Sequence, residues 1–156
     1  MDREELLRRY AAGERDFSAL KWLNIDLSGT TLHGVQFHSC GTITDLSEWS
    51  HVNLRNINWT QCNLDGCRFS FCDFRDARLF NCKIDRMFVT DCNMKRIRCG
   101  TPVGSAFIRV NFRGAMLGRN YHFCANVFTD CIREDGKFIR RGGEDPWYEI
   151  RPERRF

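Results

Sequence analysis

The nine cysteines of this 156-residue chain are the residues with the most obvious chemical potential, because thiolates bind zinc and take part in redox reactions. Five of them recur at intervals of five or ten residues: Cys62, Cys67, Cys72, Cys82 and Cys92. A zinc site needs close ligand pairs such as C-x-x-C that converge on one point, and this spacing does not supply them. A metal site from His38, Cys40 and His51 is an alternative, although nothing in the sequence fixes a fourth ligand. We expect the cysteines to be reduced and these five to fill apolar positions of a core, with no metal and no cofactor.

Groups that serve in catalysis are present, but not in an arrangement typical of an enzyme. The sequence has no nucleophile elbow, no H-E-x-x-H pair and no phosphate-binding loop. Asp65 and Asp85 lie in the same phase of the sequence pattern described below, and we expect both to be solvated surface residues. The chain is therefore not expected to be an enzyme or to bind a small-molecule substrate.

The elements that position these residues follow a repeat of five. Bulky apolar side chains recur at every fifth position, namely Trp49, Leu54, Trp59, Leu64, Phe69, Phe74, Leu79, Ile84, Val89 and Met94. An apolar residue or a cysteine stands two positions before most of them, and polar residues lie between. Neither an α-helix nor a straight strand keeps such a series on one face. A short strand followed by a turn, repeated always in the same sense, coils the chain around its own apolar side chains.

Residues twenty positions apart also match in kind, as Cys62 and Cys82 do, which favours four units in each coil. The pattern resembles the pentapeptide-repeat family, whose unit reads roughly Ala/Cys/Val, Asp/Asn, Leu/Phe, polar, variable. The segments that match include Val52–Asn56, Cys62–Gly66, Cys72–Asp76 and Val110–Gly114. The resemblance covers most of residues 16–128, and the stretch before Asp16 is similar to that of cyanobacterial members. It implies an all-β solenoid, a right-handed quadrilateral β-helix with four pentapeptides to a coil.

The chain is expected to form a single domain over residues 1–156. Residues 2–12 predict a short N-terminal capping helix, because Asp2 and Glu5 have capping-box spacing and Gly13 suits the helix end. The repeat of residues 16–128 changes phase near 40–48, where two extra residues are needed, and again near 99–106. Pro102 and the glycines of the second site predict an outward loop or bulge. Residues 129–156 are expected to form a C-terminal cap or tail.

Charged and aromatic side chains define the candidate interaction surface. The chain has a formal net charge of +4. The twenty-residue spacing places two basic columns on the outside, one of Arg55, Arg75 and Lys95 and one of Arg78 and Arg98. Phe71, Phe80 and Phe88 also point outward, where they either form a contact patch or are covered by neighbouring segments.

These features predict a non-enzymatic module for protein interaction or structural support, located in the cytoplasm. Its partner is expected to be another protein or a second copy of the chain, and no apolar run is long enough to span a membrane. Two alternatives stay open. Some members of the resembled family imitate DNA and bind DNA gyrase through a strongly acidic rod, which the charge of +4 disfavours. The basic columns could also bind nucleic acid or another anion, although a weakly basic chain makes this less favoured.

Overall fold

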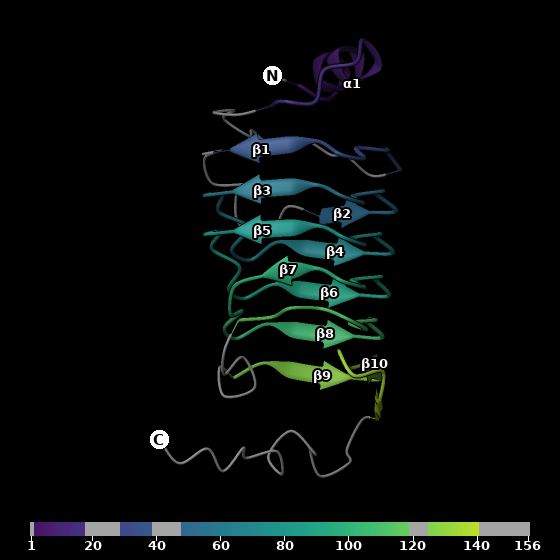
Figure 1. Ribbon diagram of the computed structural model, residues 1–156, viewed down its shortest axis with the longest axis vertical. Helices are drawn as coiled ribbons and strands as arrows, with labels where there is room; N and C mark the ends of the chain where they lie inside the picture. Colours follow the sequence, from purple (N-terminus) through teal and green to yellow (C-terminus); the bar gives the residue numbers. More distant parts are fainter. Residues whose placement is uncertain (1, 18–28, 39–47, 119–124, 141–156) are drawn as a thin grey trace.

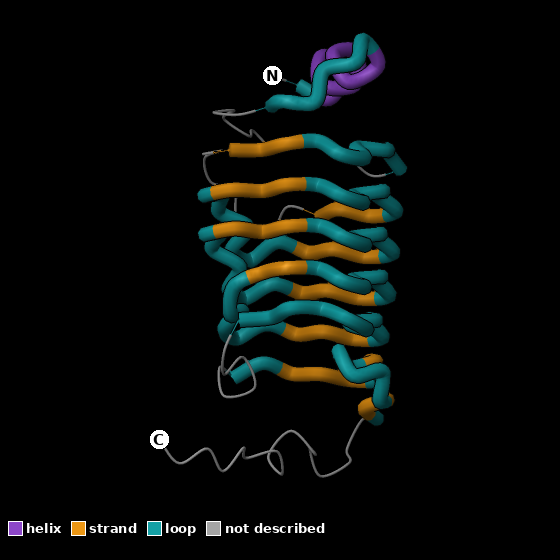
Figure 2. Tube along the Cα trace, viewed as in Figure 1, coloured by secondary structure: helices purple, strands orange, loops and turns teal. Residues whose placement is uncertain are grey.

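The chain winds into an upright column with a helix at its N-terminal end (Figure 1). The structure is a computed structural model that describes residues 2–17, 29–38, 48–118 and 125–140. The described strands have two or three residues each. Most of them pair in parallel with the strand one coil away (Figure 2). The expected all-β solenoid with a short N-terminal helix is therefore confirmed.

The column has four walls, which we number in chain order. The first wall is the sheet of β1 (Gln36–His38), β3 (Asn58–Thr60), β5 (Arg78–Phe80) and β7 (Arg98–Cys99). The second contains the bridge between Asn63 and Lys83. The third is the sheet of β2 (Glu48–Ser50), β4 (Arg68–Ser70), β6 (Phe88–Thr90), β8 (Ala106–Ile108) and β9 (Val127–Thr129). The fourth is a ladder of single bridges through Thr31, Asn53, Asp73, Asn93, Asn111 and Ile132.

The corners between walls explain why the repeat has five residues. From His51 to Arg96 every fifth residue has a positive φ, between 52° and 74°, and only Gly66 among them is glycine. This left-handed conformation turns the chain by the same angle at each corner. The residue three before many corners is Asn or Asp, and its side-chain oxygen accepts a hydrogen bond from the backbone N–H two residues later. Such side-chain turns are a known preference of Asn and Asp, and they account for the polar position of the repeat.

A corner residue tests this geometry without touching the core. Asn81 has φ of 52° and an exposed side chain. We expect Asn81→Val to lower the free energy of unfolding by about 1–2 kcal/mol, because a β-branched residue is strained in the left-handed region. Asn81→Gly should be neutral or slightly stabilising, since glycine adopts this conformation without strain. Urea denaturation of the three proteins measures the difference, and equal losses in both variants would contradict the corner assignment.

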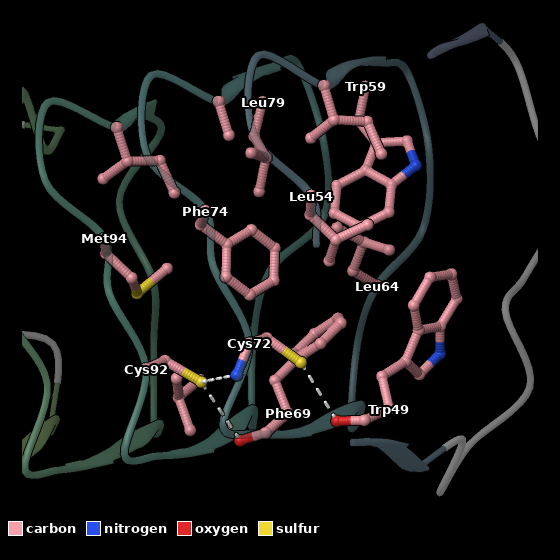
Figure 3. Packing of buried hydrophobic residues seen from close by; sticks show 14 of the residues in the cluster. Trp49, Leu54, Trp59, Leu64, Phe69, Cys72, Phe74, Leu79, Cys92 and Met94 are labelled. Carbon is pink, nitrogen blue, oxygen red and sulfur yellow. Dashed lines mark hydrogen bonds between the residues drawn. The ribbon is translucent and has the colours of Figure 1, made fainter. Parts of the chain in front are cut away.

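The interior is a stack of apolar side chains that the fifth-residue series supplies (Figure 3). Trp49 and Trp59 are at most 1% exposed, and their ring centroids lie 5.8 Å apart at near right angles. Cysteines fill the smaller inward positions and donate their thiol hydrogens to backbone carbonyls. Cys72 Sγ, for example, lies 3.2 Å from the Trp49 oxygen in the coil before it. The described cysteines are all free, and five of these seven are buried. Their packing role is therefore observed directly.

The N-terminal helix α1 spans Arg3–Ala11 and closes one end of the column. The Asp2 carboxylate accepts a hydrogen bond of 2.9 Å from the Glu5 N–H, as the capping-box spacing predicts. Leu6 is fully buried in the core cluster, while Leu7 and Tyr10 pack against it. The helix thus covers apolar surface at the start of the column.

Both expected changes of phase appear in the strand registers. Gln36 pairs with Asn58, twenty-two residues on, although most of the segment near 40–48 lies outside the described residues. At the second site Phe88 pairs with Ala106, only eighteen residues on, so this coil is two residues short. The predicted outward loop or bulge is wrong. Pro102 is buried, and its carbonyl accepts a hydrogen bond of 2.8 Å from the Asn126 side chain. A coil that is two residues short has no extra residues to form a bulge.

The last described strands form a small antiparallel hairpin of β10 (Cys131–Ile132) and β11 (Phe138–Ile139). Cys131 and Ile139 are buried in the core cluster. The remainder of the predicted C-terminal cap, residues 141–156, lies outside the described residues.

Candidate interaction surface

The carboxylates on the outside of the column are largely bound by cations from a neighbouring coil. Asp76 makes two hydrogen bonds with Arg96, of 2.6 and 2.7 Å, and Asp91 makes the same pair with Arg109. These arginines hold the pKa values of both carboxyl groups below their ordinary value. The paired contacts join successive coils at the corners.

Asp65 is the one member of this set that the structure buries, and our expectation that it is a solvated residue is wrong. Asp65 is only 2% exposed, because Arg86 and Lys83 of the next coil lie over it. The Lys83 ammonium is 2.7 Å from Asp65 Oδ2, and the Arg86 guanidinium donates to both carboxylate oxygens. Hydrogen bonds from Arg86 and then Lys83 lower the pKa of Asp65 to about 2.

The lowered pKa of Asp65 predicts a pH dependence of stability. The carboxylate contributes stability that is fully present above its unfolded pKa of about 4, and that is lost as the pH falls toward about 2. We expect Asp65→Asn to lose about 1 kcal/mol at pH 7, since Lys83 and Arg86 are more than half exposed and solvent screens the pairing. The variant should also show a shallower loss of stability in acid. Urea denaturation at pH 7, 4 and 2 tests this, with Asp85→Asn as the control that should retain the wild-type slope.

The predicted candidate residues fall on different walls. Arg55, Arg75 and Lys95 form the expected column on the fourth wall, where Arg75 is bound to Asp73 at 2.9 Å. Arg78 and Arg98 are register partners in β5 and β7 of the first wall, and Phe80 ends β5. Phe88 begins β6 of the third wall, and Phe71 follows the end of β4 and stacks on His51 at 4.8 Å. The three phenylalanines are exposed, but Phe80 lies on the wall opposite the other two.

The first wall brings basic and apolar side chains together. Two shallow hollows of about 530 and 630 Å³ lie on it, and Asn58, Arg78, Arg98 and Met116 line both. Phe80 is 65% exposed and Met116 is 61% exposed. Met116 belongs to this wall because it bridges to Arg98 across the shortened coil. Sequence reasoning missed it, since the signal depends on knowing that this coil has eighteen residues instead of twenty.

The charges of the first wall are not balanced locally. One hollow is lined by Asp76 and by Arg78, Arg96 and Arg98, so three arginines face one aspartate, a net charge of +2. Asp76 is already bound by Arg96. Arg78 and Arg98 form no ion pair with any residue of the described part of the chain, and both are exposed. This wall therefore presents two guanidinium groups that are available to an external anion.

The thiol nearest to this surface is not suited to nucleophilic chemistry. Cys99 lines the second hollow and is half-buried. Burial raises the pKa of its thiol to about 12, so it is protonated at neutral pH. Within the described ranges no three His, Cys, Asp or Glu side chains come together as metal ligands, and Cys40 of the alternative metal set lies outside those ranges. His51, another of that set, has its Nδ1 2.7 Å from Ser50 Oγ.

The repeat itself matches a known family. Residues 50–81 fit the family model described as pentapeptide repeats, with 8 copies. Residues 50–81 are therefore built of pentapeptide repeats. None of the curated proteins compared with it matches. In the described residues, no helix has the length and apolar character needed to cross a membrane.

Several solved structures are similar to this chain at low identity. A trypsin-treated form of QnrB1, a plasmid-mediated fluoroquinolone resistance protein, is 16% identical, with 76% of this chain and 74% of that chain covered and a TM-score of 0.37. HetL, involved in heterocyst differentiation regulation in the cyanobacterium Nostoc sp. strain PCC 7120, is 15% identical, with coverage of 89% and 100% and a TM-score of 0.29. Rfr23 from the cyanobacterium Cyanothece 51142 is 13% identical, with coverage of 80% and 98% and a TM-score of 0.33. None of these likenesses bears on function.

Proposed function

We propose that this pentapeptide-repeat chain is a non-catalytic module that binds a partner protein through its first wall. The observation that carries the proposal is the combination of exposed Phe80 and Met116 with Arg78 and Arg98 around the second hollow. Arginine and aromatic side chains are enriched in protein interfaces, and apolar groups beside them supply the desolvated centre that binding needs. A flat wall of a solenoid is also suited to an extended contact.

The other walls support this choice by contrast. Several of their charges are neutralised within the chain, as in the pairs Asp65–Arg86, Asp91–Arg109 and Asp73–Arg75. A partner that approached those pairs would have to compete with the chain's own counter-ions. On the first wall Arg78 and Arg98 are not held in this way by any described carboxylate.

We expect Phe80→Ser/Met116→Ser to weaken binding of the partner at least about tenfold, because interface anchors carry most of the binding energy. The full chain is used to capture proteins from cells of its source, and the identified partner is then purified and titrated by calorimetry. The matched control is Phe71→Ser/Phe88→Ser, which removes two exposed phenylalanines from the third wall and its corner. Both variants remove side chains that are largely solvated, so the fold should be retained.

Two outcomes of this binding experiment would contradict the first wall as the interaction surface. Wild-type affinity in Phe80→Ser/Met116→Ser, together with loss of binding in Phe71→Ser/Phe88→Ser, would move the interaction surface to the third wall. Loss in neither variant would remove both aromatic surfaces from consideration.

A further inference from the structure

Each strand of the first wall begins with a residue that faces outward, just before its inward-facing residue. These outward residues form a continuous column of hydrogen-bond donors. Strand pairing aligns Gln36 with Asn58, Asn58 with Arg78, and Arg78 with Arg98. Two amides are thus followed by two guanidinium groups, and the column ends at Met116. Parallel strands lie about 4.8 Å apart, so each donor is one such step from the next.

The two arginines of this column differ from most arginines around the corners. Arg96 and Arg109 each reach a carboxylate one coil before, Asp76 and Asp91 respectively. The position one coil before Arg78 is Asn58, a neutral amide, and the position before Arg98 is Arg78 itself. Like charges that lie directly opposite each other on a sheet are destabilising, so the pair gains stability when an anion binds. Guanidinium groups bind carboxylates with two parallel hydrogen bonds, which favours carboxylates as that anion.

We propose that the first wall binds an extended acidic segment of its partner. In this segment two carboxylates stand two residues apart, and an apolar side chain follows them on the same side. In an extended chain, residues two apart point to the same side and lie about 6.6 Å apart. The strands that carry Arg78 and Arg98 are about 4.8 Å apart, which is less than the spacing of these two residues of the segment. The long arginine side chains splay readily to make up the difference. The apolar side chain of the segment packs on Phe80 or Met116, which are exposed at the border of the second hollow. This inference rests on the proposed function and adds the chemistry of the partner.

The surroundings favour an acidic peptide over nucleic acid. The hollow has a net charge of only +2, and Asp76 lines it beside the arginines. A bound phosphate backbone needs a longer basic track and gains from several aromatic platforms. On this wall the described exposed aromatic side chain is Phe80.

The probe is a fluorescein-labelled peptide with the sequence Ser-Glu-Ser-Glu-Ser-Leu-Ser, titrated by anisotropy with the full chain at low and moderate salt. We expect saturable binding that weakens with salt and falls at least about tenfold in Arg78→Gln/Arg98→Gln, because two charge-assisted contacts are lost. The peptide with Gln in place of both Glu residues should lose affinity to the same extent. The control Arg68→Gln/Arg113→Gln removes the same charge from the third and fourth walls, and it should bind as the wild type does. Thermal melts check that both variants fold.

The proposal is overturned if Arg78→Gln/Arg98→Gln binds the peptide within twofold of wild type, or if single-stranded DNA at the same salt binds more tightly than the peptide. These outcomes differ from failure of the proposed function. If the purified partner still depends on Phe80 and Met116 but the peptide does not bind, the surface is right and the acidic chemistry is wrong. If the partner ignores Phe80 and Met116, the proposed function itself is wrong.

Discussion

Trp59→Ala is expected to lower the free energy of unfolding by about 3–5 kcal/mol, the usual cost of truncating a large aromatic side chain in a core. Trp59 is fully buried, and its ring centroid lies 5.9 Å from that of Phe37, 5.8 Å from that of Trp49 and 6.1 Å from that of Phe74. These rings come from different coils and walls. The cavity therefore removes contacts that join successive levels of the column.

Trp59→Phe is the matched control for this loss. The ring stays, and the buried indole Nε1, which has no hydrogen-bond partner among the described residues, is removed. Removing an unsatisfied buried donor offsets part of the lost area, so the cost should be less than half that of alanine. Urea denaturation followed by far-ultraviolet circular dichroism measures all three proteins. A loss below about 1 kcal/mol in Trp59→Ala would mean that this side chain is not in a packed core.

The second large effect is expected from Asn93→Pro on the fourth wall. The Asn93 N–H donates to the Cys72 carbonyl at 3.0 Å, and its side-chain oxygen accepts from the Lys95 N–H at 3.3 Å. Proline removes both contacts and leaves the carbonyl of buried Cys72 without its donor. We expect a loss of about 3 kcal/mol or more, because a buried carbonyl loses its donor and the proline ring constrains the backbone of the ladder at this position.

Asn93→Asp is the control for the proline variant. Aspartate keeps the N–H and the side-chain acceptor, and Asp73 already occupies the same position one coil before. This variant should retain stability within about 0.5 kcal/mol. Thermal and urea denaturation compare the two. Equal stability of the proline and aspartate variants would show that the fourth wall is not held by this ladder.

Much of the fold was predictable because the same five-residue pattern recurs along most of the chain. The fifth-residue apolar series alone identifies Leu54, Leu64 and Phe74 as core residues, and all three are buried. The N-terminal helix could be predicted equally well, since its N-cap and apolar stripe are local sequence signals. The shortened coil was not, because Pro102 is compatible with a bulge as well as with a buried turn, and only strand register separates them.

The candidate surface was harder to predict from the sequence, since it depends on contacts between coils. The pattern gave the alignment of Arg78 with Arg98, which the register bears out. It did not reveal that Arg86 and Lys83 cover Asp65, because their side chains reach across from the next coil. It also did not place Met116 beside these arginines, since that needs the register after the shortened coil.

In the four-walled column, residues twenty apart lie side by side. Nuclear Overhauser spectroscopy of the isotope-labelled full chain tests it most directly. We predict backbone contacts that connect Asn53 to Asp73, Asp73 to Asn93, and Asn63 to Lys83. Contacts between residues three or four apart through this region, without any between residues twenty apart, would contradict the four-walled column and every surface assigned to it.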